Sequence, residues 1–203
     1  MRSAEEVLLE GIRAGQFGGE TKPHGDHAMG FVAFSDDPQR DFVGHVIDIG
    51  SGAGLPALIL ADAFPDTTWT LIERRSGRTE LLSRAVHRLD LVDRVDVITG
   101  DVAIAARTEL RGSADFVTAR SFGPPGDTAE CAAPFLRPDG CLLVSEPFDG
   151  DTETRWPKDG LDKAGLTLRN VWTLPEGKYA RFCRSDEDRP NLPRRGARKN
   201  LLF

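Results

Sequence analysis

The sequence has no long apolar segment and few cysteines. Its longest apolar run, residues 55–61, contains a proline, whereas a membrane-spanning helix needs roughly 18 or more apolar residues. Residues 1–11 carry three glutamates and no apolar core, so we expect no signal peptide. The three cysteines, Cys131, Cys141 and Cys183, form no CxxC pair, which argues against a zinc ribbon or a redox motif. A small, odd number of cysteines favours a reducing compartment, and we expect a cytoplasmic protein.

An excess of positive charge is also missing. The 26 basic and 32 acidic residues give a net charge of −6 and a pI near 5.3, which argues against a protein that only coats nucleic acid. The last fifteen residues are an exception, because they contain five basic residues and no acidic one. With 203 residues, of which 39% are hydrophobic, the chain can bury a core without disulfides or a metal.

Short apolar strands alternate with helices through the middle of the chain. The predicted strands are residues 45–49, 68–73, 94–99, 114–119 and 141–145. The predicted helices are residues 55–64, 76–89, 102–110 and 126–136. This alternation is typical of βαβ units and a parallel sheet. Residues 166–174 and 178–184 then flank a Pro-Glu-Gly turn and predict an antiparallel hairpin. We therefore expect a Rossmann-like α/β fold with a mostly parallel seven-stranded sheet and helices on both faces.

We expect the chain to consist of three parts. Residues 1–43 are predicted to be an N-terminal arm, with a short helix over residues 1–14 and a loop with at most one helical turn over residues 15–43. Residues 44–185 form the α/β domain, and residues 186–203 form a basic tail.

The most informative local feature is a glycine-rich turn directly after the first predicted strand. There the sequence reads Asp48-Ile-Gly50-Ser51-Gly52-Ala-Gly54. Glycines allow a tight bend and let a ligand approach the backbone. An acid two residues before the first glycine does not suit a pyrophosphate, but it suits a ligand with a positive group, such as the ammonium of an amino acid. The alternative is a tight turn without a ligand.

Two further acids follow later strands of the predicted sheet. Glu73 ends the second strand, where an acid can accept hydrogen bonds from both hydroxyls of a ribose. Asp101 and Val102 follow the third strand, where a carboxylate can accept from an adenine amine. The alternatives are a solvated Glu73 and an Asp101 that only caps the following helix. The carboxyl ends of parallel strands share one edge, so we expect these residues to lie together.

This set of motifs with a terminal hairpin resembles the class I S-adenosylmethionine-dependent methyltransferases. Three segments are similar to the family of 16S ribosomal RNA guanine-N7 methyltransferases, also called RsmG or GidB. They are DIGSGAGLP at residues 48–56, TARSF at residues 118–122, and LPRRG at residues 192–196 near the terminal LLF. The N-terminal region is shorter than in that family.

The resemblance implies a cofactor, a reaction and a partner. S-adenosylmethionine would bind to the turn residues named above, to Glu73, and to Asp101 and Val102. The acceptor would be RNA, at guanine N7 of 16S ribosomal RNA or a related site, with the small ribosomal subunit as partner. N7 carries a free lone pair, so the reaction needs no general base and depends on alignment. Arg120 is the candidate catalytic residue, and Arg120, Arg194 and Arg195 are candidates for substrate phosphates.

Alternatives remain open at this stage. Glu146 stands where the family commonly has a lysine, which favours a small-molecule acceptor on the same fold. A nucleotide-binding α/β protein without catalysis is a further alternative, whereas the glycine spacing and Asp48 argue against a dinucleotide-dependent oxidoreductase. His24 and His27 lack a third ligand at suitable spacing, so no metal is expected.

Overall fold

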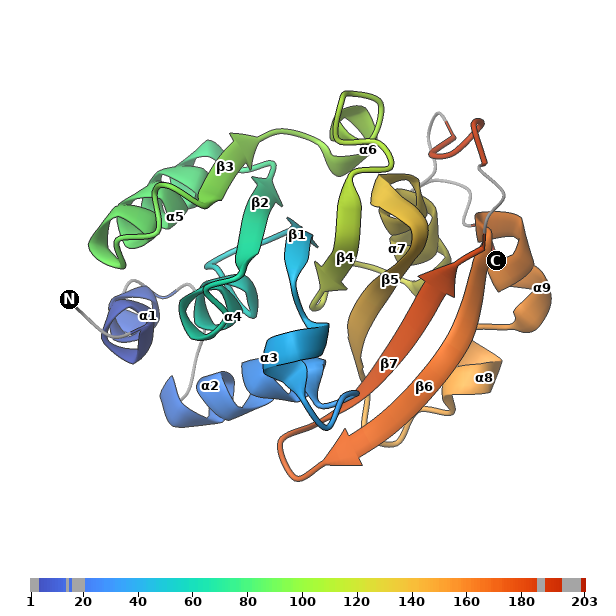
Figure 1. The fold of residues 1–203 in the computed structure, drawn as a ribbon, viewed down its shortest axis with the longest axis horizontal. Coiled ribbons are helices and arrows are strands. Elements are labelled where there is room, and N and C mark those ends of the chain that lie inside the picture. Colours follow the sequence, from blue (N-terminus) through green and yellow to red (C-terminus); the bar gives the residue numbers. More distant parts are fainter. Residues whose placement is uncertain (1–3, 14, 16–20, 186–188, 195–201) are drawn as a thin grey trace.

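A computed structural model describes residues 4–13, 15, 21–185, 189–194 and 202–203. Seven strands form one sheet in the order β3-β2-β1-β4-β5-β7-β6 (Figure 1). They are β1 (Gly44–Ile49), β2 (Thr67–Glu73), β3 (Val95–Thr99), β4 (Ala114–Ala119), β5 (Leu136–Glu146), β6 (Leu166–Leu174) and β7 (Gly177–Arg184). The first five strands pair in parallel, and β7 pairs antiparallel with both β5 and β6. The predicted fold class and terminal hairpin are confirmed.

Helices cover both faces of the sheet. They are α1 (Ala4–Arg13), α2 (Thr21–Met29), α3 (Pro38–Asp41), α4 (Ala57–Ala63), α5 (Ser76–Arg88), α6 (Val102–Ala105), α7 (Pro125–Ala132), α8 (Thr152–Arg155) and α9 (Lys158–Ala164), with short 3₁₀ turns at Gly30–Val32 and Ala133–Phe135. One core cluster joins α1, α2, α4 and α5 to the sheet, and a second joins α6, α7 and α9 to its other face. Alternate residues of β1 point into these two cores, as a central parallel strand requires.

The prediction of a loop over residues 15–43 is wrong for most of that segment. It contains α2, a 3₁₀ turn and α3, and Phe31 and Phe42 are fully buried in the first core. The hairpin holds this segment in place. Tyr179 donates a hydrogen bond from its hydroxyl to the His27 carbonyl at 2.8 Å, and Trp172 donates from its indole to the Gly30 carbonyl at 2.8 Å. Local sequence does not reveal this packing, because α2 has a weakly amphipathic, polar sequence and owes its position to tertiary contacts.

Other element boundaries differ in smaller ways. The helix predicted over residues 102–110 ends at Ala105 and continues as tighter turns with i→i+3 hydrogen bonds. Strand β5 begins at Leu136 rather than at Cys141. Helices α8 and α9, which lie between β5 and β6, were not anticipated. The division into arm, domain and tail stays a prediction.

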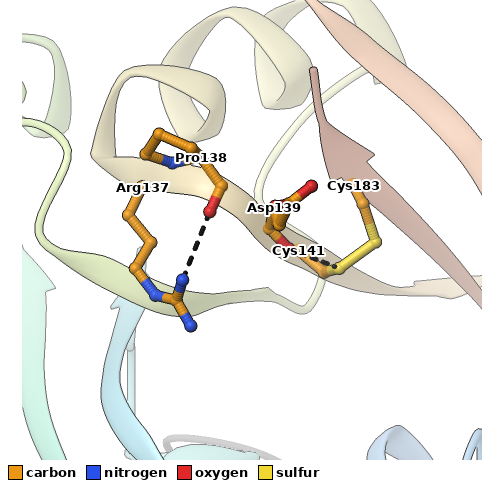
Figure 2. The surroundings of a disulfide bond; sticks show 5 residues. All are labelled: Arg137, Pro138, Asp139, Cys141 and Cys183. Atoms are coloured by element: carbon orange, nitrogen blue, oxygen red, sulfur yellow. Dashed lines mark hydrogen bonds between the residues drawn. A yellow bond between two sulfur atoms is a disulfide. The ribbon is translucent and has the colours of Figure 1, made fainter. Parts of the chain in front are cut away.

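Two of the three cysteines are joined, although 42 residues separate them in the sequence. Cys141 and Cys183 are directly opposite on β5 and β7, with 4.0 Å between their Cα atoms, and their sulfur atoms form a disulfide (Figure 2). Cys131 is buried and is not part of this disulfide. The spacing of the cysteines along the chain does not reveal this disulfide, because it depends on the strand order that brings β5 and β7 together.

Within the described part of the chain, no helix has both the length and the apolar character to cross a bilayer.

Candidate functional site

The strand order reverses between β1 and β4, which both lie in the middle of the sheet. Open α/β sheets bind ligands in the crevice at the carboxyl ends of the strands at such a point. A cavity of about 220 Å³ lies there. Its lining residues are Gly50, Ile72, Glu73, Arg74, Arg75, Arg78, Gly100, Val102, Ser121 and Phe122. The structure therefore brings Gly50, Glu73 and Val102 together, as the sequence predicted.

Glu73 is fixed at the end of β2 with its carboxylate against the glycine turn. It is only 5% exposed, so it is not the solvated acid of the alternative reading. One carboxylate oxygen accepts the backbone N–H of Gly52 at 3.1 Å, and the other accepts that of Arg75 at 2.9 Å. The guanidinium of Arg78 lies 3.9 Å away. Each oxygen keeps acceptor capacity, because a carboxylate oxygen has two lone pairs, so Glu73 can also bind a diol in the cavity.

The glycines of the turn have different roles. Gly50, Gly52 and Gly54 all have positive φ, at 70°, 56° and 97°, which favours glycine at each position. A Cβ on Gly54 would lie 2.7 Å from Cγ of Leu58, so this glycine allows close packing of α4. A Cβ on Gly52 would meet nothing closer than an Arg78 nitrogen at 3.6 Å. The space beside Gly52 is therefore open, whereas the space at Gly54 is filled by the protein.

Ser51 and Asp48 stabilise the turn through hydrogen bonds. The Ser51 hydroxyl donates to the Asp48 carbonyl at 3.0 Å. The Asp48 side chain is 1% exposed and accepts a hydrogen bond from the Thr118 hydroxyl on Oδ1 at 2.6 Å. Its Oδ2 is buried without a hydrogen-bond partner among the described residues. Burial raises the pKa of Asp48 to about 7, although the hydrogen bond from Thr118 opposes the rise. A buried, unpaired carboxylate oxygen is costly unless a donor occupies the space beside it.

Asp101 has the capping role that the sequence offered as one alternative. It accepts the backbone N–H of Ala103 on Oδ1 at 2.8 Å and begins α6. It does not line the cavity, but its neighbours Gly100 and Val102 do. A Cβ on Gly100 would meet only Ile98, at 3.8 Å. The role of Asp101 in binding a ligand stays a prediction.

A second cavity, of about 390 Å³, lies on the β4–β5 side of the first. The two cavities share Ser121 and Phe122, and Ser121 has a positive φ of 53°. Such backbone strain in a residue other than glycine is common at functional sites. The second cavity is lined by His27, Ala119, Arg120, Ser121, Phe122, Gly123, Thr128, Val144, Ser145, Glu146, Pro147, Arg155 and Trp156.

Arg120 follows β4 and lies in the wall of this second cavity. One of its terminal nitrogens donates to Nδ1 of His24 at 3.3 Å. Burial lowers the pKa of Arg120 from its ordinary value, but an arginine stays charged at neutral pH. Burial, with Arg120 and His24 nearby, lowers the pKa of His27 to about 4. His27 is therefore neutral at pH 7, and Arg120 supplies positive charge.

The tail residue Arg194 lies away from both cavities. Its backbone N–H, Nε and Nη2 donate to the carboxylate of Glu130 on α7, at 2.7, 2.9 and 2.8 Å. Glu130 is completely buried, so Arg194 attaches the tail to the domain. Its predicted contact with a substrate phosphate gains no support from this placement. Arg195 lies outside the described residues.

Several residues of the two cavities were missed by the sequence reasoning. Arg74, Arg75 and Arg78 line the first cavity, and Arg155 lines the second. Arg74 and Arg75 directly follow Glu73, and Arg78 lies in the first turn of α5, so their nearness to Glu73 in the sequence was a signal for them. Arg155 belongs to α8, which was not anticipated, and no sequence signal placed it at the site.

Solved structures with a similar fold are methyltransferases. An O-methyltransferase family protein from Burkholderia thailandensis aligns over 83% of this chain and 57% of its own, with a TM-score of 0.59 and 18% identity. The antibiotic-resistance methyltransferase Kmr aligns over 69% of this chain and 86% of its own, with a TM-score of 0.55 and 19% identity. At these identities the similarity shows the fold alone, which is the Rossmann-like fold of class I methyltransferases.

Curated relatives are more similar in sequence. The ribosomal RNA small subunit methyltransferase G of Corynebacterium diphtheriae is 38% identical over 121 residues, which are 57% of this chain and 54% of the relative. The protein of the same name from Parasynechococcus marenigrum is 36% identical over 116 residues, which are 57% and 47%. The chain thus spans about half the length of the curated relatives it matches. A family model described as rRNA small subunit methyltransferase G matches residues 28–156, which is more than half of the chain. The chain therefore belongs to the GidB family.

Proposed function

We propose that this protein is an S-adenosylmethionine-dependent methyltransferase that acts on RNA, at guanine N7 of 16S ribosomal RNA or a related site. The observation that carries the proposal is the first cavity, where Glu73 and the glycine turn meet beside the buried Asp48. Membership of the GidB family supports it, as do relatives named for a ribosomal RNA of the small subunit. The small ribosomal subunit would then be the partner, and the cytoplasm would be the location.

The residues present fit this cofactor. The unpartnered Oδ2 of Asp48 would accept from the ammonium of the methionine part, which would satisfy a buried acceptor. Glu73 would accept from the ribose hydroxyls, and the open space beside Gly100 would receive the adenine. When bound, S-adenosylmethionine supplies an electrophilic methyl group on a sulfonium.

The second cavity fits the acceptor. It adjoins the first through Ser121 and Phe122, so an acceptor atom there can be brought next to the methyl donor. Guanine N7 has a lone pair and loses no proton before it attacks, so no general base is required. His27 is not needed as a base, and the residues around the cavity would act by alignment and exclusion of water.

A small-molecule acceptor is the second candidate. Glu146 favours it, because this carboxylate lies in the second cavity and its side chain is 2% exposed. A buried acid at an acceptor site repels a polyanion unless a cation compensates it.

Calorimetric titration with S-adenosylhomocysteine and with NADH tests the cofactor. Transfer of labelled methyl to ribosomal RNA from cells that lack this activity tests the acceptor. The proposal predicts binding of S-adenosylhomocysteine alone and label in the small-subunit RNA. Binding of NADH, or label only in small molecules, would overturn it.

A further inference from the structure

The acid at the end of β5 is tied to two donors of one short segment. Arg155 donates from Nε to Oε2 of Glu146 at 2.9 Å, and Trp156 donates from its indole nitrogen to Oε1 at 3.0 Å. Trp156 is itself 3% exposed and packs on Phe182, with 4.3 Å between ring centroids. Each carboxylate oxygen of Glu146 therefore has a donor from the protein, and the buried indole fixes its orientation. Glu146 therefore fixes the position of Arg155 and is not a free acid that faces a ligand.

The guanidinium of Arg155 is held through only one of its three nitrogens. Nη1 and Nη2 have no hydrogen-bond partner among the residues that the structure describes, and the side chain is 37% exposed in the wall of the second cavity. A guanidinium fixed at Nε and open at its two terminal nitrogens can form paired hydrogen bonds with two oxygens of a phosphate.

The charges of the second cavity favour an anion. Its charged lining residues are Arg120, Arg155 and Glu146, which sum to +1, while His27 is neutral near pH 7. The acid that favours a small-molecule acceptor is thus compensated by Arg155, and Arg120 adds a further positive charge to the lining.

We propose that Arg155, held in place by Glu146, binds a phosphate group of the acceptor at the second cavity. The ligand is a phosphate-bearing nucleotide, and under the proposed function it is a phosphodiester of RNA next to the methylated base. The inference rests on the proposed function in that the second cavity is taken as the acceptor site.

The variants Arg155→Gln and Arg155→Lys test this inference, with Arg137→Gln as the matched control. Arg137 also holds a carboxylate through Nε, that of Asp115 at 2.6 Å, and is 53% exposed. It lies at the other end of β5 and lines neither cavity. Binding of a short single-stranded RNA is measured by fluorescence anisotropy over a range of salt concentrations, and binding of S-adenosylhomocysteine is measured by calorimetry.

We expect Arg155→Gln to weaken RNA binding roughly tenfold at low salt, because charge-assisted hydrogen bonds to one phosphate are lost. The slope of log K against log salt should become shallower by about 0.7, which is one phosphate contact on a single strand. Arg155→Lys should restore the slope but only part of the affinity, because a lysine cannot make the paired hydrogen bonds. Arg137→Gln should change neither quantity, and all three variants should bind S-adenosylhomocysteine as the parent does.

Equal RNA affinity and slope for Arg155→Gln and Arg137→Gln would overturn the inference. If the parent protein does not bind RNA, the proposed function fails, and guanosine monophosphate and guanosine then serve as probes. A preference of the parent for the monophosphate that is lost in Arg155→Gln would support the phosphate site without RNA. No such preference would overturn it.

Discussion

Replacement of Glu73 by glutamine is the sharpest test of the cofactor cavity. Glu73 is 5% exposed, and its two oxygens accept backbone N–H groups of Gly52 and Arg75. Glutamine has nearly the same shape, but it has no charge and presents an NH₂ group to one of these donors. The change therefore removes a charge-assisted acceptor of the ribose and also disturbs the turn. Hydrogen bonds to charged groups contribute about 1.5–3 kcal/mol, so the Kd for S-adenosylhomocysteine should rise about 10-fold to 150-fold.

Isothermal titration calorimetry with S-adenosylhomocysteine measures this effect. Glu146→Gln is the matched control, because Glu146 is also a buried acid at the carboxyl end of a strand but lines the other cavity. We expect the control to bind as the parent does. An unchanged Kd for Glu73→Gln, in a protein with parental circular dichroism, would refute the assignment of Glu73 to the ribose.

Four further predictions concern two glycines of the turn, the buried acid and the tail. Gly52→Val should keep the fold, because the nearest protein atom to the added Cβ is an Arg78 nitrogen at 3.6 Å. It should abolish binding of S-adenosylhomocysteine, because a residue other than glycine is strained at a φ of +56° and its side chain would fill the open space beside the turn. Retained binding by calorimetry would contradict this role. In contrast, Gly54→Ala should lower the melting temperature, since its Cβ would lie 2.7 Å from Cγ of Leu58. Burial raises the pKa of Asp48 to about 7, and a bound ammonium favours the charged carboxylate, so affinity for S-adenosylhomocysteine should rise between pH 6 and pH 7 and level off above it. Asp48→Asn should remove this dependence, and an unchanged pH profile would count against an ammonium at Oδ2. Arg194→Ala should lower the free energy of unfolding in urea by about 2 kcal/mol, because the buried Glu130 loses its cation and keeps only the backbone N–H of residue 194 as a donor. The 40% exposure of the Arg194 side chain reduces this cost. A change within 0.5 kcal/mol, the usual range for a surface substitution, would show that this ion pair does not stabilise the fold.

The sequence predicts the sheet well because its strands and helices have clear periods. Central strands such as β1 are short apolar runs bounded by glycine, and the hairpin β6–β7 is marked by its Pro-Glu-Gly turn. Strand β5 was predicted too short, because Pro138, Asp139 and Gly140 are typical of turns yet lie within the strand. Helix α2 was not predicted because its own sequence is polar and gives no helical period. Contacts from Tyr179 and Trp172 of the hairpin fix this segment instead.

The sequence motifs predict several lining residues of the first cavity but few of those in the second. Glu73 and Gly50 were found because their spacing along the chain follows the strand ends. The pairing of Glu146 with Arg155 and Trp156 depends on how the segment after β5 folds back, and no periodic signal marks that turn. The ion pair of Arg194 with Glu130 joins residues 64 positions apart, and the basic composition of the tail pointed to RNA instead.

The most direct measurement is to map the methyl group after transfer. Small ribosomal subunits from cells that lack the family activity are incubated with the protein and labelled S-adenosylmethionine, and the digested 16S ribosomal RNA is analysed by nucleoside mass spectrometry. The account predicts N7-methylguanosine in this RNA with the parent protein and a strongly reduced amount with Glu73→Gln at limiting cofactor. Absence of N7-methylguanosine with a parent protein that binds S-adenosylhomocysteine would contradict the assignment of the acceptor.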